Sequence, residues 1–200
     1  MKRRAVPALV LLTMWGMGGL LAEAQQPAAE TQQPAAERPR DPAAIQLEAM
    51  KKLASWAGQW RGSGWILTWP SRTRQDFTIT ETVQSKLGGR VLLVEGLGRG
   101  KDAATGAEVD MHVTLAVLSY DEKAQTYRFR THEASGRALD AEAKPIDGGL
   151  EWGFRDEASG SIIRFTIHLD ANRWHEVGEA SRDGKTWHKF LEMTLERQPP

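Results

Sequence analysis

Four charged residues could do chemistry because they occupy positions on otherwise apolar strand faces. They are Glu81, Glu95, Glu176 and Lys189, and each has an aromatic or aliphatic residue two positions away. If these faces point inward, three carboxyl groups and one ammonium group lie in a mostly apolar interior, where they require partners. Such groups either orient a ligand or act as acid and base. The other interpretation places each of them at a strand end, at the mouth of the fold or on a solvated face.

Aromatic residues accompany these charged positions. Those on predicted apolar faces are Phe77, Tyr127, Phe129, Trp152, Phe154, Phe165, Trp174 and Trp187. They either line a pocket or fill a core, and filling a core is the commoner role. Trp65, Leu67 and Trp69 form a further alternating face, which is a candidate ligand or partner surface if it points outward.

Several other chemistries lack their residues. The chain has no cysteine, which excludes disulfides, cysteine nucleophiles and thiolate metal sites. Its five histidines form no H-x-H or H-E-x-x-H pair, and the glycine-rich run 96–100 precedes no predicted helix. The 26 Lys and Arg balance the 26 Asp and Glu, unlike the basic excess of nucleic-acid binders. We therefore expect no metal, no cofactor and no nucleic-acid partner, and we assign no catalytic residue.

The elements that position these residues are one helix and a series of strands. Asp41 and Pro42 suit the N-cap and first position of a helix, which we predict within residues 41–57. From residue 58 onward, apolar residues recur with a period of two between short turn sequences such as Asp147-Gly148-Gly149. Short connections and the need to protect sheet edges favour an all-β, antiparallel up-and-down β-barrel of about ten strands over residues 58–200. A two-sheet sandwich is the alternative.

The N-terminus has the pattern of an export signal. Lys2, Arg3 and Arg4 precede an apolar run, and Ala22-Glu23-Ala24 fits a signal-peptidase site. We predict a signal peptide over residues 1–24, cleavage between Ala24 and Gln25, and a disordered Gln/Pro/Ala linker over residues 25–40. The expected location is secreted or periplasmic, with no stable membrane insertion after cleavage. An uncleaved anchor is the alternative.

Three short stretches resemble known barrel proteins. The stretch 56–64, with Trp60 inside Gly-x-Trp-x-Gly, resembles the opening of lipocalin-like (calycin) barrels and, more weakly, of nitrobindin and fatty-acid-binding-protein-like barrels. The stretches 118–121 and 181–187 resemble a bacterial domain-of-unknown-function family of exported lipocalin-like proteins. The resemblance covers about residues 50–197. It implies that Trp60 packs across the closed end of a barrel, with Arg197 as its partner. Nitrobindin-type haem binding is not carried over, because the last predicted strand, 191–197, has no histidine.

These observations predict an exported barrel that binds a small apolar or amphipathic molecule without transforming it. Its expected ligand-binding residues are the four charged residues Glu81, Glu95, Glu176 and Lys189 and seven aromatic ones, Phe77, Tyr127, Phe129, Trp152, Phe165, Trp174 and Trp187. One alternative is an isomerase, cyclase or hydrolase that uses the inward glutamates as acid or base. Another is an envelope interaction module that contacts its partner through Trp65 and Trp69. The sequence leaves open the ligand and the oligomeric state.

Overall fold

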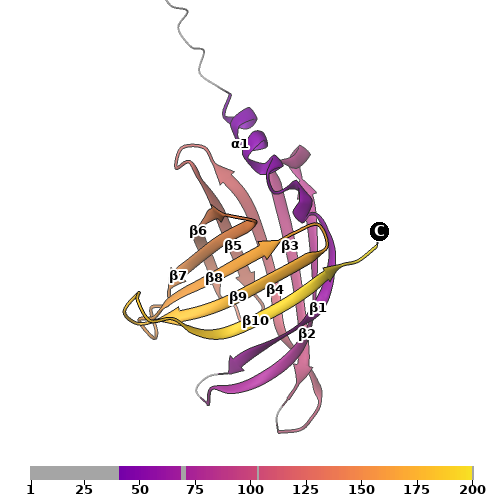
Figure 1. Cartoon of the computed structure of the whole chain (residues 1–200), viewed down its shortest axis with the longest axis vertical. Helices are drawn as coiled ribbons and strands as arrows, with labels where there is room; N and C mark the ends of the chain where they lie inside the picture. Colours follow the sequence, from indigo (N-terminus) through magenta and orange to yellow (C-terminus); the bar gives the residue numbers. More distant parts are fainter. Residues whose placement is uncertain (1–40, 69–70, 103, 200) are drawn as a thin grey trace, which may run out of the picture. The chain divides into compact units, whose positions relative to one another are not determined.

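Backbone hydrogen bonds join every strand to the strand before it in the chain, and the first strand to the last. All ten pairings are antiparallel, so the sheet closes into an up-and-down barrel with no free edge (Figure 1). The computed structural model describes residues 41–68, 71–102 and 104–199. It confirms the predicted fold class and excludes the two-sheet sandwich. The predicted signal peptide (1–24) and linker (25–40) lie outside the described residues.

The strands have lengths typical of a strongly coiled barrel. In chain order they are β1 (Gly58–Thr68), β2 (Thr73–Lys86), β3 (Val91–Lys101), β4 (Glu108–Asp121), β5 (Thr126–Glu133), β6 (Ala138–Ile146), β7 (Gly149–Arg155), β8 (Ile162–Leu169), β9 (Arg173–Ser181) and β10 (His188–Arg197). A short 3-10 turn, η2 (Leu87–Gly89), joins β2 to β3. Within the described ranges, no helix is long and apolar enough to cross a membrane.

An N-terminal helix packs at one end of the barrel. Helix α1 (Pro42–Lys51) starts at Asp41, whose Oδ1 accepts a hydrogen bond from the Ala43 N–H at 3.0 Å. A 3-10 turn, η1 (Ala54–Trp56), follows it, so the predicted helical region is divided into two pieces. The Tyr127 hydroxyl donates to the Ala49 carbonyl at 2.8 Å and thereby ties α1 to β5. In Figure 1 the β1–β2 and β3–β4 hairpins lie at the opposite end.

Tryptophans fill the end of the barrel next to α1. Trp60 is 1 % exposed, and its Nε1–H donates to the Trp56 carbonyl at 3.0 Å. The ring of Trp174 lies 5.4 Å from that of Trp56 and 5.9 Å from that of Trp60, measured between centroids. Arg197 lies over Trp60, with its guanidinium carbon 4.1 Å from the ring centroid. Aromatic packing and a cation–π contact therefore close this end.

Candidate functional site

The barrel interior contains a largely enclosed cavity of about 90 Å³. Its walls are mainly apolar and aromatic, as small-molecule sites generally are. Its polar lining residues are Glu81, His112, Thr114, Thr131, Glu133, Arg137 and Glu176. The cavity is well below the roughly 300–1,000 Å³ of pockets that hold drug-sized molecules, so it suits a small occupant.

Glu81 is a buried acid in this cavity. It lies on β2, between Trp60 of β1 and Gly96 of β3 in the sheet register, and is 4 % exposed. Its Oε2 is fully buried and has no hydrogen-bond partner among the described residues. Burial raises the pKa of Glu81 to about 8, and the charge of Glu176 contributes to the rise. Glu81 is therefore largely protonated at neutral pH when the cavity holds no cation.

Glu176 is the second buried acid. It lies on β9 and is 8 % exposed, and its Oε2 accepts a hydrogen bond from the Trp174 Nε1–H at 3.1 Å. Burial raises the pKa of Glu176 to about 7, against the opposing effect of that hydrogen bond. The two glutamates come from strands far apart in sequence, and the barrel brings them to one cavity.

An aromatic stack forms one wall. Trp152 lies between Phe129 and Phe165, with ring centroids 4.6 and 4.5 Å away and nearly parallel planes. The Trp152 Nε1 is buried and has no hydrogen-bond partner in the part of the chain that the structure describes. The stack thus forms an apolar aromatic wall in which the faces of Trp152 are covered, and it leaves one buried donor that a ligand could use.

The outer end of the cavity is polar. Arg137, just before β6, donates from Nη2 and Nε to Oε1 of Glu133 at 2.8 and 3.0 Å. Its guanidinium carbon is 5.4 Å from the Phe154 ring centroid. His112 of β4 is half-buried, and burial lowers its pKa while the charge of Glu133 opposes the shift. These residues form the mouth group, defined as His112, Glu133, Arg137 and Phe154.

Most of the predicted ligand-binding residues are in the cavity. Those that line it are Phe77, Glu81, Phe129, Trp152, Phe165, Trp174 and Glu176. Tyr127 is buried but does not line the cavity, since its hydroxyl reaches α1 instead.

The predicted inward orientation is wrong for Glu95 and Lys189. On β3 the inward positions are Leu92, Val94 and two glycines, so Glu95 points to solvent. Because glycine has no apolar side chain, the alternation of hydropathy along β3 does not show that these positions point inward. On β10, an irregularity in the pairing with β9 between Lys189 and Leu191 turns Lys189 outward, where its Nζ lies 3.0 Å from Glu192 Oε1.

Trp187 is also outside the cavity. It precedes β10 and is half-buried against Arg164, whose guanidinium carbon lies 3.9 Å from its ring centroid. Trp65 lies on the outer face of β1, under the guanidinium carbon of Arg74 at 4.8 Å from its ring centroid. Trp69 lies outside the described residues.

Sequence reasoning missed five polar lining residues. They are His112, Thr114, Thr131, Glu133 and Arg137. The alternation in β4 is misleading because the outward residues Val113 and Leu115 are apolar, each 39 % exposed, and the inward residues are His112 and Thr114. For His112 and Thr114, apolar residues at the paired positions of β3 would have indicated the inward face. Those partners are Gly98 and Gly96, which have no side chain and therefore give no such signal.

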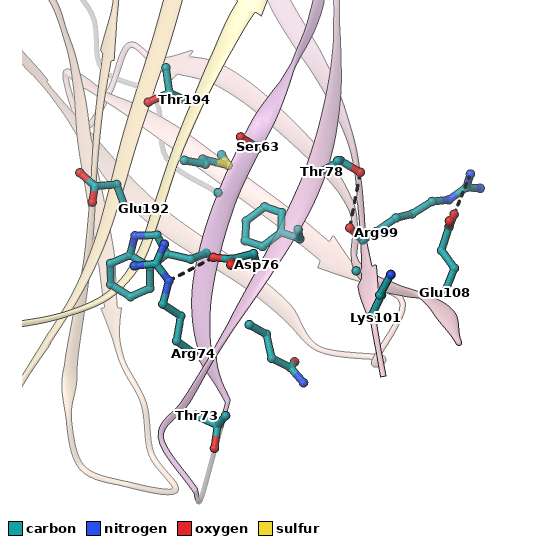
Figure 2. A pocket seen from close by; sticks show the side chains of 16 residues that line it. Ser63, Thr73, Arg74, Asp76, Thr78, Arg99, Lys101, Glu108, Glu192 and Thr194 are labelled. Carbon is teal, nitrogen blue, oxygen red and sulfur yellow. Dashed lines mark hydrogen bonds and ion pairs between the residues drawn. The ribbon is translucent and has the colours of Figure 1, made fainter. Parts of the chain in front are cut away.

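A second hollow is an open cleft of about 1060 Å³ on the β1, β2, β3 and β10 side (Figure 2). Most of its charged side chains already have partners, namely Arg74, Asp76, Arg99, Glu108 and Glu192. Arg74 Nε lies 3.0 Å from Asp76 Oδ1, and Arg99 lies between two carboxylates, Glu108 at 3.9 Å and Asp110 at 3.1 Å. Exposed, paired charges create little demand for a ligand. We therefore place the candidate site in the smaller interior cavity.

Among the described residues, no group of three or more His, Cys, Asp or Glu side chains is arranged to hold a metal ion. The two buried glutamates and the Trp152 N–H are suited to hydrogen-bonding an organic molecule.

Solved structures with the same fold are found by structural comparison. Rv2717c from M. tuberculosis aligns with a TM-score of 0.54 and 16% identity, over 76% of this chain and 98% of that chain. The S-type phycobiliprotein lyase CPES from Guillardia theta aligns with a TM-score of 0.50 and 8% identity, over 76% of this chain and 93% of that chain. No protein-family model matches the sequence, and neither does any curated protein. At these identities the likeness is one of fold alone, the closed antiparallel β-barrel described above.

Proposed function

We propose that this protein binds a small apolar or amphipathic molecule inside its barrel. The observation that carries the proposal is the pair of unsatisfied buried polar atoms in residues that line the cavity, Glu81 Oε2 and Trp152 Nε1. A buried acceptor or donor without a partner costs about 1–3 kcal/mol, which a ligand with matching groups would recover. The aromatic stack supplies the apolar surface around them.

The cavity volume restricts the size of this molecule. A cavity of about 90 Å³ is smaller than the roughly 150 Å³ apolar cavity that holds benzene. Long acyl chains and tetrapyrroles would require the interior side chains to move. A small molecule, or the small head of a larger one, fits the geometry.

Native mass spectrometry of the purified protein tests this proposal, followed by titration of tryptophan emission with a panel of small amines, alcohols and acids. Trp152 and Trp174 line the cavity, so an occupant should change their emission. A protein that carries no bound molecule, and whose emission no member of the panel alters, would contradict the binding function. A cavity that holds only water would give this result, with no bound molecule in the mass spectrum and no change in tryptophan emission.

A second candidate function is acid–base catalysis in the same cavity. The pKa of Glu81 is raised to about 8 and that of Glu176 to about 7, so near neutral pH one can donate a proton while the other accepts one. NMR of a bound small molecule distinguishes the two functions. Turnover that is lost in Glu81→Gln while binding persists would favour the enzyme, and an unchanged molecule would favour the binding protein.

The proposal includes export to the periplasm or the exterior. The sequence before the barrel has the pattern of a signal peptide with a small-x-small cleavage site. We expect the exported form to begin at Gln25, which N-terminal sequencing or the intact mass would show. A mass that includes residues 1–24 would support the uncleaved anchor instead.

A further inference from the structure

We infer that the cavity selects a small alkylammonium ion bearing at least one N–H, in preference to neutral or acidic molecules of the same size. This inference rests on the proposed binding function and names its ligand class.

The inner part of the cavity has an excess of acidic groups. Glu81 and Glu176 both line it, and the only Lys or Arg among the described lining residues is Arg137. Arg137 is already engaged by Glu133 at the mouth. The other basic residue of the described lining is His112, and burial lowers its pKa and so disfavours its charged form. No Lys or Arg of the described lining is therefore left to neutralise the two inner carboxyl groups when they ionise, and a cationic ligand would supply the missing charge.

The aromatic wall also suits a cation. Phe129, Trp152 and Phe165 stack with centroids 4.5–4.6 Å apart, and Trp174 and Phe77 line the same cavity. Aromatic rings around an ammonium group attract it through their negative faces, most strongly where water is excluded. Both faces of Trp152 are covered by Phe129 and Phe165, so a cation would meet the other rings of the lining. Those rings, together with the carboxyl groups, favour a cation over a neutral alkyl group.

The orphaned oxygen of Glu81 determines the type of cation. Glu81 Oε2 is buried without a partner among the described residues, and once Glu81 ionises beside a bound cation this oxygen can only accept hydrogen bonds. A primary, secondary or tertiary ammonium ion provides both the charge and the donor. A quaternary ion provides the charge alone, and an alcohol provides a donor and an acceptor but no charge.

Binding of the cation should release a proton. The titratable and charged groups that face the cavity are Glu81 on β2, His112 on β4, Glu133 on β5, Arg137 before β6 and Glu176 on β9. Because Glu133 is already paired with Arg137, the groups whose ionisation a cation in the cavity should change are Glu81 and Glu176. Because burial raises the pKa of Glu176 to about 7 and that of Glu81 to about 8, the affinity for an ammonium ion should rise by at least about tenfold between pH 6 and pH 8.

Four probes with equal numbers of heavy atoms test the inference on the purified protein. They are n-butylammonium, tetramethylammonium, n-butanol and propionate. We expect affinity to fall in that order, measured by isothermal titration calorimetry and tryptophan emission. Calorimetry in two buffers of different ionisation enthalpy should show proton release for n-butylammonium and none for n-butanol.

Two variants assign the selectivity to the cavity. Glu81→Gln removes the charge at nearly constant shape and should weaken n-butylammonium binding about tenfold or more while leaving n-butanol binding nearly unchanged. Glu95→Gln is the matched control, because Glu95 lies on the neighbouring strand but points to solvent. It should leave all four affinities unchanged.

The inference and the proposed function fail in different ways. If n-butanol or propionate binds as tightly as n-butylammonium, the ammonium inference is overturned and the binding function stands. If tetramethylammonium binds as tightly, the N–H requirement is overturned. If no probe binds, the ammonium inference is likewise overturned, and the mass spectrum of the purified protein then decides the binding function.

Discussion

Gly96 pairs directly with Glu81 across β2 and β3, and its lack of a side chain leaves the space that the Glu81 carboxyl group occupies. A Cβ atom at Gly96 would lie 2.7 Å from Glu81 Oε1 and 2.6 Å from Oγ1 of Thr114, its partner on β4. Both distances are shorter than van der Waals contact. The buried acid thus depends on a glycine in the neighbouring strand.

The substitution Gly96→Ala should destabilise the barrel and disturb the cavity. The added methyl group has to displace the Glu81 carboxyl group, Thr114 or both within a packed interior, which costs about 1–3 kcal/mol. Urea denaturation measures this loss, and a titration with n-butylammonium should show weaker binding. The matched control is Gly106→Ala, where a Cβ meets nothing within 4 Å and a positive φ of 70° gives backbone strain alone. Equal binding by the Gly96→Ala and parent proteins would contradict the role of Gly96.

The two buried glutamates should make stability fall as the pH rises. Burial raises the pKa of Glu81 to about 8 and that of Glu176 to about 7, from an ordinary value of 4.5 for both. Between about pH 4.5 and pH 8 the native state holds protons that the unfolded chain has already released, so raising the pH favours unfolding. Their contribution to stability is therefore largest below about pH 4.5 and is lost as the pH rises towards 8.

Glu81→Gln isolates this effect. The variant should be more stable than the parent by on the order of 5 kcal/mol at pH 9 and by little at pH 5, because the amide cannot ionise. Urea denaturation at several pH values measures the difference. Glu95→Gln serves as the control and should give a curve parallel to the parent's, since Glu95 is exposed. Parallel curves for Glu81→Gln would show that Glu81 titrates normally.

Much of the fold was predictable because local signals agree with one another. Alternation such as Ile163, Phe165 and Ile167 defines strands, and short polar turns fix their order. The turn after β9 shows the mechanism, since Oδ1 of Asp183 accepts hydrogen bonds from the backbone N–H groups of Lys185 and Thr186, both at 2.8 Å. Closure follows because ten antiparallel strands otherwise leave two unprotected edges.

The site was only partly predictable, because tertiary packing decides which face of a strand points into the barrel. Glu81 and Glu176 lie on faces whose apolar residues point inward, so period two located them correctly. Glu95 lies on β3, whose outward face is also apolar, and Lys189 lies beside a bulge that shifts the period. His112 points inward in phase with the buried Ala116 and Leu118, but Val113 and Leu115 make the outward face of β4 apolar as well, so hydropathy does not distinguish the two faces.

The contact between Trp60 and Arg197 should be a main source of stability at the closed end. Arg197 covers the Trp60 ring and donates hydrogen bonds to the carbonyls of Ala57, at 2.8 Å, Ala171, at 2.7 Å, and Ser55. Arg197→Lys retains the charge but cannot make this set of contacts, so we expect a loss of about 1–2 kcal/mol in urea denaturation.

The control for Arg197→Lys is Arg61→Lys on the exposed face of β1, which should change stability by less than about 0.5 kcal/mol. If the two lysine variants were equally stable, the guanidinium at position 197 would have no special role in closing the barrel.

Arg137 and Phe154 should control the rate at which a small molecule enters the cavity. Arg137 lies over Phe154 and is held by Glu133, and all three residues line the cavity at its outer end. Arg137→Ala removes a side chain that covers the mouth, so both the association and the dissociation rate of n-butylammonium should rise several-fold, with a smaller change in affinity. Stopped-flow tryptophan fluorescence measures both rates. Because the Arg137 side chain is 48% exposed, losing its ion pair should cost at most about 1 kcal/mol of stability.

Arg137→Met separates steric from electrostatic effects at the mouth. Methionine keeps most of the bulk and removes the charge, so a steric barrier predicts rates close to those of the parent. If Arg137→Met accelerates entry as much as Arg137→Ala, the positive charge rather than the bulk of Arg137 limits entry. If neither variant alters the rates, small molecules reach Glu81 by another route, and the mouth group is not the entrance to the cavity.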